Sequence, residues 1–279
     1  MILGLAHRLS LGWIFRFAAI GVAVGVAAIG VTGCAGEQLL ATSAIEGNGS
    51  ADGGNSASAY AVASAHKSKP FNPFEDPHAT DIGKRQVLTN PSVEEVMKVG
   101  ALPEMSIGRA DAPVTVIKYA SLTCPYCKKF QATVFPQFKR NYIDTGKARF
   151  IIREFPIGRS SGNATIALRC APADKYFKLY GKFLEQQGKW VSQEVRLDNI
   201  YQVASQVGLS RAQFDACLKN QDLINGLAWV KDRGRTLGVI GTPNFYIQNK
   251  LVKKVLDYDG LVALVEAELS ARKTMAVAN

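Results

Sequence analysis

Apolar and β-branched residues are concentrated in two short runs in the middle of the chain, Val114–Ala120 and Ala148–Glu154. Each run has the composition and length of a β-strand. Between the runs, apolar residues recur at helical spacing, at Phe130, Val134 and Phe138. The pattern predicts a strand, a helix that Pro136 kinks near its middle, and a second strand parallel to the first.

The pattern changes after the second predicted strand. Residues 163–237 contain no strand-like run but several helical patterns, and Ser210-Arg-Ala-Gln213 has the form of a capping box that starts one of these helices. Asn244–Gln248 and Leu251–Val255 then predict a hairpin. Apolar residues spaced for a closing helix follow at Leu261, Leu264, Val265 and Leu269. The predicted order is βαβ, a helical insertion, then ββα, which is an α/β fold.

The N-terminal segment, residues 1–34, is apolar and carries no charge after Arg16. This pattern predicts an export signal or a membrane anchor, because a run of about 20 uncharged residues can span a bilayer. The segment ends in Val31-Thr-Gly-Cys34, which resembles a bacterial lipobox and makes Cys34 a candidate for lipidation. A cleaved signal peptide, a lipoprotein signal and a retained anchor all place the remaining chain in the oxidising bacterial cell envelope, facing the periplasm.

Residues 35–90 are rich in Ala, Ser, Gly and Asn over most of their length, which predicts a flexible linker. Residues 91–102 contain one short amphipathic helix over Pro91–Lys98. That helix either packs at the edge of the following domain or serves self-association, and packing is the favoured interpretation. The chain is therefore predicted to carry one domain, residues 103–273, tethered to a membrane through its N-terminus.

Composition and charge limit the classes of partner. Of the 279 residues, 47% are hydrophobic, which is an ordinary globular composition, and the formal net charge is +10. Residues 1–100 contain 7 Lys and Arg against 8 Asp and Glu, so the basic excess belongs to the rest of the chain. Its basic clusters are scattered and lack interleaved aromatic residues, so nucleic acid is not an expected partner.

Two of the five cysteines, Cys124 and Cys127, lie three positions apart, with Pro125 and Tyr126 between them. Such a pair is typical of a redox couple, of half a metal site or of a structural disulfide. The pair comes between the first predicted strand and its helix, so Cys124 is expected at a helix N-terminus, where unpaired N–H groups stabilise a thiolate. Cys124 is then the predicted nucleophile, and Cys127, one turn into the helix, the predicted resolving cysteine.

These motifs resemble those of DsbA-type thiol-disulfide oxidoreductases, which have a thioredoxin-like fold with a helical insertion. The resemblance covers residues 103–273. It rests on four segments: Ala112–Ile117, Cys124-Pro-Tyr-Cys127, Arg153-Glu-Phe-Pro156 and Gly241-Thr-Pro243. It implies an enzyme, without cofactor or bound metal, that introduces disulfides into unfolded or reduced exported proteins. It also implies a membrane redox partner that resets the cysteine pair.

The resemblance assigns supporting roles to further residues. Pro243 resembles the family's cis-proline, which faces the cysteine pair and leaves the backbone of Thr242 to a substrate strand. Tyr126 departs from the family, because strongly oxidising members usually carry His there. Lys118 also departs, because members often have an acid at this position, six residues before Cys124, that is thought to relay protons. The sequence leaves open which way Lys118 points and how it affects the redox potential.

Cys170 and Cys217 lie on apolar faces of predicted helices in the insertion. In an exported protein, two such thiols are expected to form a structural disulfide. Buried free thiols are one alternative. A four-cysteine zinc site with Cys124 and Cys127 is another, although zinc ligands usually come as two close pairs.

The leading functional hypothesis is an oxidase that acts as a monomer, because only a short helix precedes the domain and a dimer platform usually needs more. The alternatives are a disulfide isomerase or reductase of the same fold, and a thiol metal-binding module. Pro125 and Gly241-Thr-Pro243 favour disulfide exchange. A metal site needs neither a rigid exposed sulfur nor an edge that docks a peptide.

Overall fold

A computed structural model describes residues 86–278 of the chain. The predicted signal or anchor, Cys34 and most of the predicted linker lie outside the described residues. Residues 86–90 already contact the domain, because the Leu88 N–H donates to the Thr236 carbonyl at 2.9 Å and the Leu88 side chain packs against the core. The predicted linker therefore ends before Leu88. Within residues 86–278, no helix is both long and apolar enough to cross a membrane.

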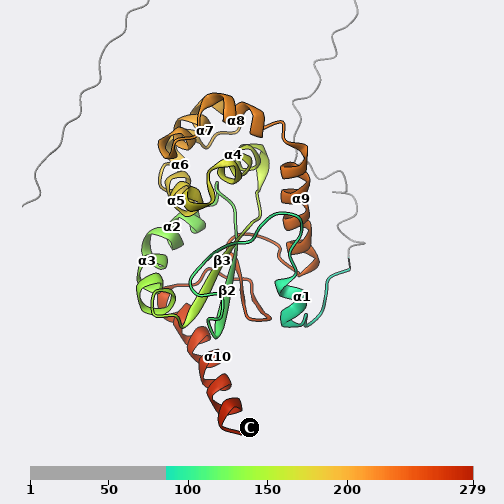
Figure 1. Cartoon of the computed structure of the whole chain (residues 1–279), viewed down its shortest axis with the longest axis vertical. Helices are drawn as coiled ribbons and strands as arrows, with labels where there is room; N and C mark the ends of the chain where they lie inside the picture. Colours follow the sequence, from blue (N-terminus) through green and yellow to red (C-terminus); the bar gives the residue numbers. More distant parts are fainter. Residues whose placement is uncertain (1–85, 279) are drawn as a thin grey trace, which may run out of the picture. The chain divides into compact units, whose positions relative to one another are not determined.

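The centre of the domain is a five-stranded mixed sheet in the order β1-β3-β2-β4-β5. Strands β2 and β3 are parallel, and the other neighbouring pairs are antiparallel. The strands span Met105–Ile107 (β1), Val114–Ala120 (β2), Ala148–Glu154 (β3), Asn244–Ile247 (β4) and Lys250–Val252 (β5). Almost every residue of β2 and β3 is buried, because helices cover both faces of the sheet (Figure 1).

One face of the sheet packs against three helices: α2 (Pro125–Thr133), α3 (Phe135–Phe138) and α10 (Tyr258–Ala278). Aromatic rings fill this layer. The Phe130 ring of α2 lies 5.1 Å from the Phe245 ring of β4 and 6.3 Å from the Phe150 ring of β3, measured between centroids. Burying each such side chain contributes about 1.5–3 kcal/mol, so this layer fixes α2 firmly on the sheet.

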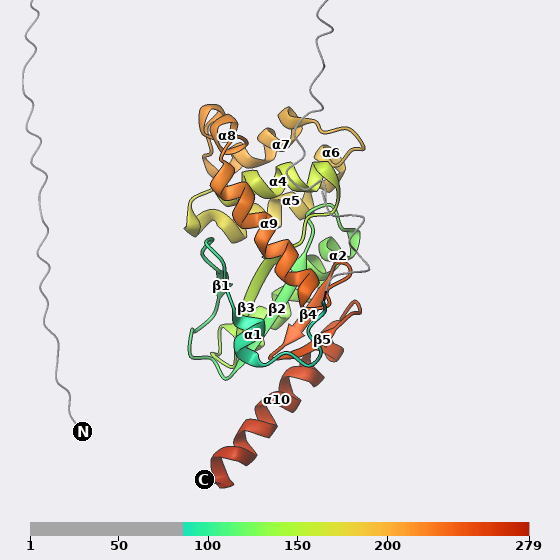
Figure 2. The same ribbon diagram turned by 90° about the vertical axis from the view of Figure 1, so that its right-hand side faces the viewer.

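The opposite face is covered by α1 (Val93–Met97) and α9 (Gln221–Thr236), and Figure 2 shows α9 crossing it. Val96 of α1 is fully buried in a cluster with Tyr119 of β2, so the short N-terminal helix packs on the domain. Close approach of α9 requires Gly234, because a Cβ there would lie 2.7 Å from the Tyr119 ring.

The helical insertion follows β3 and lies beyond the end of the sheet, next to α2 (Figure 1). Its helices are α4 (Gly158–Cys170), α5 (Tyr176–Glu185), α6 (Gln187–Trp190), α7 (Leu197–Ala204) and α8 (Arg211–Cys217), with short 3₁₀ turns at Ala173–Lys175 and Ser205–Val207. Its first helix begins at Gly158, five residues before the expected start. The predicted capping box at Ser210 is present.

The predicted α/β order is confirmed, and β2 and β3 have the predicted bounds. Three details differ. Pro136 lies in the first turn of α3, so the helix breaks after Thr133 instead of kinking, and a π-helical turn follows over Lys139–Ile143. Strand β5 ends at Val252, and β1 was not predicted, because three residues are too few to show a period.

Candidate active site

Cys124 lies at the junction between β2 and α2. The chain turns after β2, and the Cys124 N–H donates to the Ser121 carbonyl at 3.2 Å. Cys124 is the N-cap of α2, and its Sγ accepts a hydrogen bond from the Cys127 backbone N–H at 3.3 Å. Pro125 follows in the first turn, where a missing N–H costs nothing. The fold thus fixes one sulfur atom at a helix N-terminus.

The surroundings of Cys124 favour its thiolate. Its pKa falls from 9.0 to about 5, first because of hydrogen bonding with the Cys127 side chain, while burial opposes the shift. The backbone N–H groups of Cys127 and Tyr126 lower the pKa further. Cys124 keeps 9% of its surface exposed. A charged sulfur that remains accessible is the nucleophilic form of cysteine.

Cys127 has the opposite properties. It is 0% exposed, and burial raises the pKa of its thiol well above 9.0. The hydrogen bond to Cys124 acts in the same direction, whereas the charge of Lys118 opposes it. The two cysteines are not joined by a disulfide in this structure. A reagent from solvent would reach Cys124 first.

The cis-proline loop, Ile240–Pro243, faces the cysteine pair. Its Thr242–Pro243 peptide bond is cis, as the resemblance implies, and the Cys124 Sγ lies 3.1 Å from the Thr242 carbonyl oxygen. Asn244 braces the loop, because its Oδ1 accepts from the Ile240 N–H and its Nδ2 donates to the Pro243 carbonyl. Two segments that are 118 residues apart in sequence therefore meet at one sulfur.

Exposed apolar side chains lie on the three segments that meet at the cysteine loop. Tyr126 on the first turn of α2 is 56% exposed, and Ile240 in the cis-proline loop is 79% exposed. Ile157, after β3, is 50% exposed, and its carbonyl accepts from the Thr123 hydroxyl at 3.3 Å. This surface can contact apolar side chains of a chain bound beside Cys124.

The insertion holds the cysteine loop in place. Gln187 of α6 donates through Nε2 to the carbonyls of Leu122, at 2.7 Å, and Cys124, at 3.0 Å. Ser121 shares a hydrogen bond with Ser161 of α4 at 2.8 Å between their hydroxyl oxygens. Sequence reasoning missed these contacts, because a single Gln or Ser in a helix carries no signal of the loop that it contacts.

Lys118 points into the core on the face of β2 that packs against α2, and it is 0% exposed. Its Nζ has no hydrogen-bond partner among the described residues and lies 4.4 Å from the centroid of the Phe130 ring. Burial lowers the pKa of Lys118 from 10.5 to about 8, while the charges of Cys127 and Cys124 raise it. The structure thus settles the direction that the sequence left open.

Arg153 and Glu154, from the motif shared with the DsbA type, point to opposite faces of the sheet. Glu154 accepts from Arg169 Nη2 at 2.8 Å and from the Tyr176 hydroxyl at 2.7 Å. Arg153 pairs with Glu104, with 3.1 Å between Nη2 and Oε2. These contacts tie β3 to α4, to α5 and to the segment before β1, which is a structural role.

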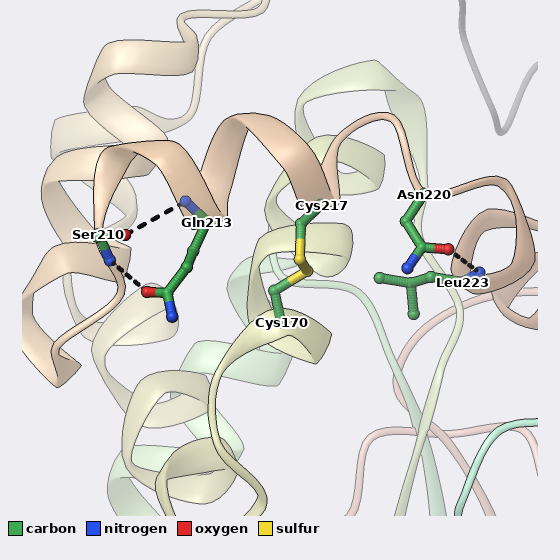
Figure 3. Close-up of a disulfide and its surroundings, with 6 residues drawn as sticks. All are labelled: Cys170, Ser210, Gln213, Cys217, Asn220 and Leu223. Carbon is green, nitrogen blue, oxygen red and sulfur yellow. Dashed lines mark hydrogen bonds between the residues drawn. A yellow bond between two sulfur atoms is a disulfide. The ribbon is translucent and has the colours of Figure 1, made fainter.

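Cys170 and Cys217 are joined by a disulfide that links the ends of α4 and α8, with Cα atoms 6.2 Å apart (Figure 3). Both pack against a small apolar cluster formed by Ile166 of α4 with Ile224 and Leu227 of α9. Across residues 86–278, no group of three or more His, Cys, Asp or Glu side chains could hold a metal ion. The donor set of a four-cysteine zinc site is therefore not assembled in the described part of the chain.

Fold and site together define a class of protein: an α/β domain with a Cys-x-x-Cys pair at a helix N-terminus, opposite a cis-proline. The family described as Thioredoxin matches residues 101–267. This match covers more than half of the chain, and the chain belongs to this family.

Curated relatives carry names related to disulfide chemistry. A putative protein-disulfide oxidoreductase from Rickettsia conorii is 29% identical over 167 residues, which cover 58% of this chain and 60% of that protein. A probable disulfide bond formation protein D from Bacillus cereus is 28% identical over 174 residues, which cover 60% of this chain and 79% of that protein. The chain thus spans less than two thirds of the length of the Rickettsia conorii relative.

Solved structures share the fold. Alpha-DsbA1 from Wolbachia pipientis has a TM-score of 0.59 and 24% identity, and the match covers 65% of this chain and 99% of that chain. Oxidised BdbD from Bacillus subtilis has a TM-score of 0.57 and 23% identity, and the match covers 66% of this chain and 98% of that chain. These likenesses confirm the thioredoxin-like fold with a helical insertion.

Proposed function

We propose that the chain is a thiol-disulfide oxidoreductase of the bacterial cell envelope that introduces disulfides into exported proteins through Cys124 and Cys127. One observation carries the proposal: Cys124 caps the N-terminus of α2 through its Sγ and keeps 9% of its surface exposed, whereas Cys127, three residues later, is fully buried. A stabilised thiolate favours the reduced pair over the disulfide, which makes the disulfide a stronger oxidant.

The reaction follows from the difference between the two sulfur atoms. A thiolate of the client, the exported protein to be oxidised, attacks the Cys124 sulfur of the oxidised pair. The bond between Cys124 and Cys127 breaks, a mixed disulfide forms, and Cys127 leaves as a thiolate that takes up a proton. A second client thiolate then attacks the client sulfur of the mixed disulfide and releases Cys124. Its low pKa makes Cys124 a good leaving group, and two electrons have passed from client to enzyme.

Client binding fits the exposed apolar side chains beside Cys124, which are Tyr126, Ile157 and Ile240. Unfolded proteins expose the apolar residues that a folded protein buries, so this surface favours unfolded over folded clients. The cis-proline loop supplies a fixed backbone segment at the same sulfur, where an extended client segment can lie. Neither the apolar surface nor the loop backbone selects for a particular client side chain, which suits an enzyme with many clients.

An oxidase needs a partner that reoxidises its cysteine pair after each cycle, and we place that partner in the membrane. The N-terminal segment, cleaved, lipidated at Cys34 or retained as an anchor, would target the domain to the same compartment. The name of the Bacillus cereus relative, disulfide bond formation protein D, supports the oxidising direction. We propose a monomer with a potential of about −120 to −200 mV, the span between strong oxidants and protein disulfide isomerase. Tyr126 favours the reducing end of that range.

Trapping of clients tests the assignment of the two sulfurs. A Cys127→Ala variant cannot form its own disulfide, but its Cys124 thiolate can attack a disulfide of an oxidised client, which is the reverse of the last step above. Because no Cys127 thiol remains to displace that client, mixed disulfides between Cys124 and client proteins should accumulate in cells. A Cys124→Ser variant should accumulate none. Clients trapped through Cys127 in the Cys124→Ser variant would reverse the assignment, and no trapping in either variant would contradict the proposed exchange.

The redox state of the pair in intact cells tests the direction. An oxidase should be recovered mostly as the Cys124–Cys127 disulfide after rapid acid quenching and alkylation. An isomerase keeps its pair reduced and usually presents two sites to one client. Recovery of a reduced pair, together with a stable dimer in light scattering, would replace the oxidase proposal by an isomerase.

A further inference from the structure

A cavity lies beside α9, which packs against β3 and α4 (Figure 2). Its wall comes from these three elements and from the segment Lys98–Glu104 before β1, and no residue of the cysteine loop or the cis-proline loop lines it. The enclosed part measures about 20 Å³, which exceeds the roughly 10–15 Å³ that one buried water needs. With the part open to solvent, the empty space is about 330 Å³. The cavity therefore admits a small molecule.

The side chains that line this cavity carry an excess of positive charge. Its cations are Lys98, Arg153, Arg169 and Arg233. Among the described residues, Glu104 is the one carboxylate in the wall, and it is shared between Arg149 and Arg153. Arg169 is paired with Glu154. With these pairs included, five cations stand against two carboxylates, so the group attracts an anion.

Arg233 of α9 is the cation whose hydrogen bonding is incomplete. Its Nη2 donates to the Glu95 carbonyl of α1 at 2.7 Å. Its Nε is buried and has no hydrogen-bond partner among residues 86–278. A buried donor without an acceptor is costly, and the cost is larger when the donor is charged. Arg233 is therefore a donor in the cavity wall that still needs an acceptor.

The other two guanidinium groups of the wall are held in place by the fold. Arg153 donates through Nη1 to the Val96 carbonyl and through Nη2 to Glu104. Arg169 donates through Nη1 to the Pro103 carbonyl at 2.7 Å. The two arginine side chains are only 7% and 6% exposed. Groups that are already fixed lose little conformational freedom on binding, and the planar guanidinium matches the geometry of a carboxylate or a phosphate.

We propose that this cavity binds a small organic carboxylate. Apolar side chains complete its wall, among them Leu102, Ile152 and Val230. A carboxylate offers two oxygens to the guanidinium groups and a carbon chain to these apolar side chains, whereas a phosphate ion would place further charged oxygens against them. The bound carboxylate accepts from the Nε of Arg233 and joins the segment Lys98–Glu104 to α9. Binding at this site is independent of the disulfide exchange proposed above.

Calorimetric titration of the full chain with propionate, at constant ionic strength, tests the site. The wild type should bind one propionate per chain with a saturable curve. Arg233→Met removes a charged donor and should weaken binding about tenfold or more. Arg235→Met removes the same charge two residues further along α9, outside the cavity wall, and as the matched control should bind like the wild type. No saturable binding to the wild type, or an equal loss in both variants, would overturn the proposal.

A second measurement needs no variant. In NMR spectra of the wild type, the Nε–H signal of Arg233 should shift with propionate and saturate together with the calorimetric curve. The Nε–H signal of Arg272, an exposed residue near the end of α10, is the internal control and should not follow that curve. An Arg233 signal that does not move would refute the site.

Inorganic phosphate distinguishes the class of ligand. In the same titration, at equal ionic strength, phosphate should bind more weakly than propionate. Chloride, which keeps the ionic strength constant, should not displace propionate at equal concentration. Tighter binding of phosphate than of propionate, or displacement of propionate by chloride, would overturn the assignment of a carboxylate.

Discussion

Two helices of this domain begin with the same hydrogen bond, made by different atoms. At α2 the Sγ of Cys124 accepts from the backbone N–H of Cys127, three residues on, at 3.3 Å. At α8 the Oγ of Ser210 accepts from the N–H of Gln213, also three residues on, at 3.2 Å. The Ser210 N–H in turn donates to the Gln213 Oε1 at 2.9 Å, which closes a capping box that Figure 3 displays.

The two N-caps differ in whether the capping atom can ionise. The Ser210 hydroxyl is neutral at any physiological pH, so its cap contributes a constant stability. The Cys124 sulfur ionises, so the helix N-terminus stabilises a charge there and the cap changes with pH and with redox state. The cysteine inside each helix follows the same division. Cys127 is free beneath Cys124, whereas Cys217 at the end of α8 is held in a disulfide.

The largest expected effect comes from replacing the Cys124 cap of α2 by a serine cap like that of α8. Cys124→Ser should reduce disulfide transfer to a reduced two-cysteine peptide to the uncatalysed rate, because a hydroxyl cannot form the mixed disulfide. Serine is a preferred N-cap, so α2 should remain folded. Exchange at the wild-type rate in Cys124→Ser would show that Cys124 is not the nucleophile.

Chemical denaturation of the same variant has a pH signature. The pKa of Cys124 is depressed in the folded protein, so its ionisation stabilises the reduced wild type fully above the unfolded pKa near 9 and loses that effect as the pH falls through about 5. The stability gap between reduced wild type and Cys124→Ser should therefore grow from pH 5 to pH 9. A gap that is independent of pH would contradict the depressed pKa.

The next effect separates the two sulfurs of the pair. Alkylation of the reduced wild type with iodoacetamide should modify Cys124 with a midpoint of about pH 5, because only the thiolate reacts. Cys127 should stay unmodified at that pH, since burial raises the pKa of its thiol well above 9.0. Peptide mapping after the reaction assigns each site. A midpoint for Cys124 near 8.5, the ordinary value for a free thiol, would show that its cap does not stabilise the charge.

Sequence patterns were enough to predict those elements that a single local signal determines. The β-rich runs gave β2 and β3 with their observed bounds, and Ser210 with Gln213 predicted the start of α8. The place of Cys124 at a helix N-terminus also followed from local order, because a strand comes before it and a helix after it. The cis bond at Pro243 did not follow from pattern, since most X-Pro bonds are trans, and came from the resemblance alone.

The parts that the sequence left open depend on contacts between distant segments. Lys118 reads as one polar residue in an apolar strand, and only its packing beneath α2 decides its direction and its pKa. Gln187 contacts the cysteine loop across 63 residues, and no periodicity encodes that contact. Strand β1 forms because β3 has a free edge to pair with, which its three residues do not reveal.

Removal of the Cys170–Cys217 disulfide should lower the stability of the fold but should leave the reactivity of Cys124 unchanged. The bond between Cys170 and Cys217 closes a loop with a sequence separation of 47. Loop-closure entropy then predicts that the Cys170→Ala/Cys217→Ala double variant loses about 4 kcal/mol of unfolding free energy. Denaturation with the active pair oxidised in both proteins measures this loss. The alkylation midpoint of Cys124 should be unchanged. Free, alkylatable thiols at both positions in protein purified from the envelope would show that the bond does not form in the cell.

The smallest effect belongs to the Ser210 cap itself. Ser210→Ala removes the hydroxyl that accepts from the Gln213 N–H and should cost about 1 kcal/mol of stability. Hydrogen exchange locates the loss, because the Gln213 amide should exchange faster in the variant. The Leu223 amide is the internal control: it donates to Asn220 at the start of α9, in a cap that the substitution leaves intact (Figure 3). Equal acceleration at both amides would mean that the two helices open together. Faster exchange at Gln213 alone, with the Cys124 alkylation midpoint unchanged, would establish the α8 cap as purely structural, in contrast to the cap at α2.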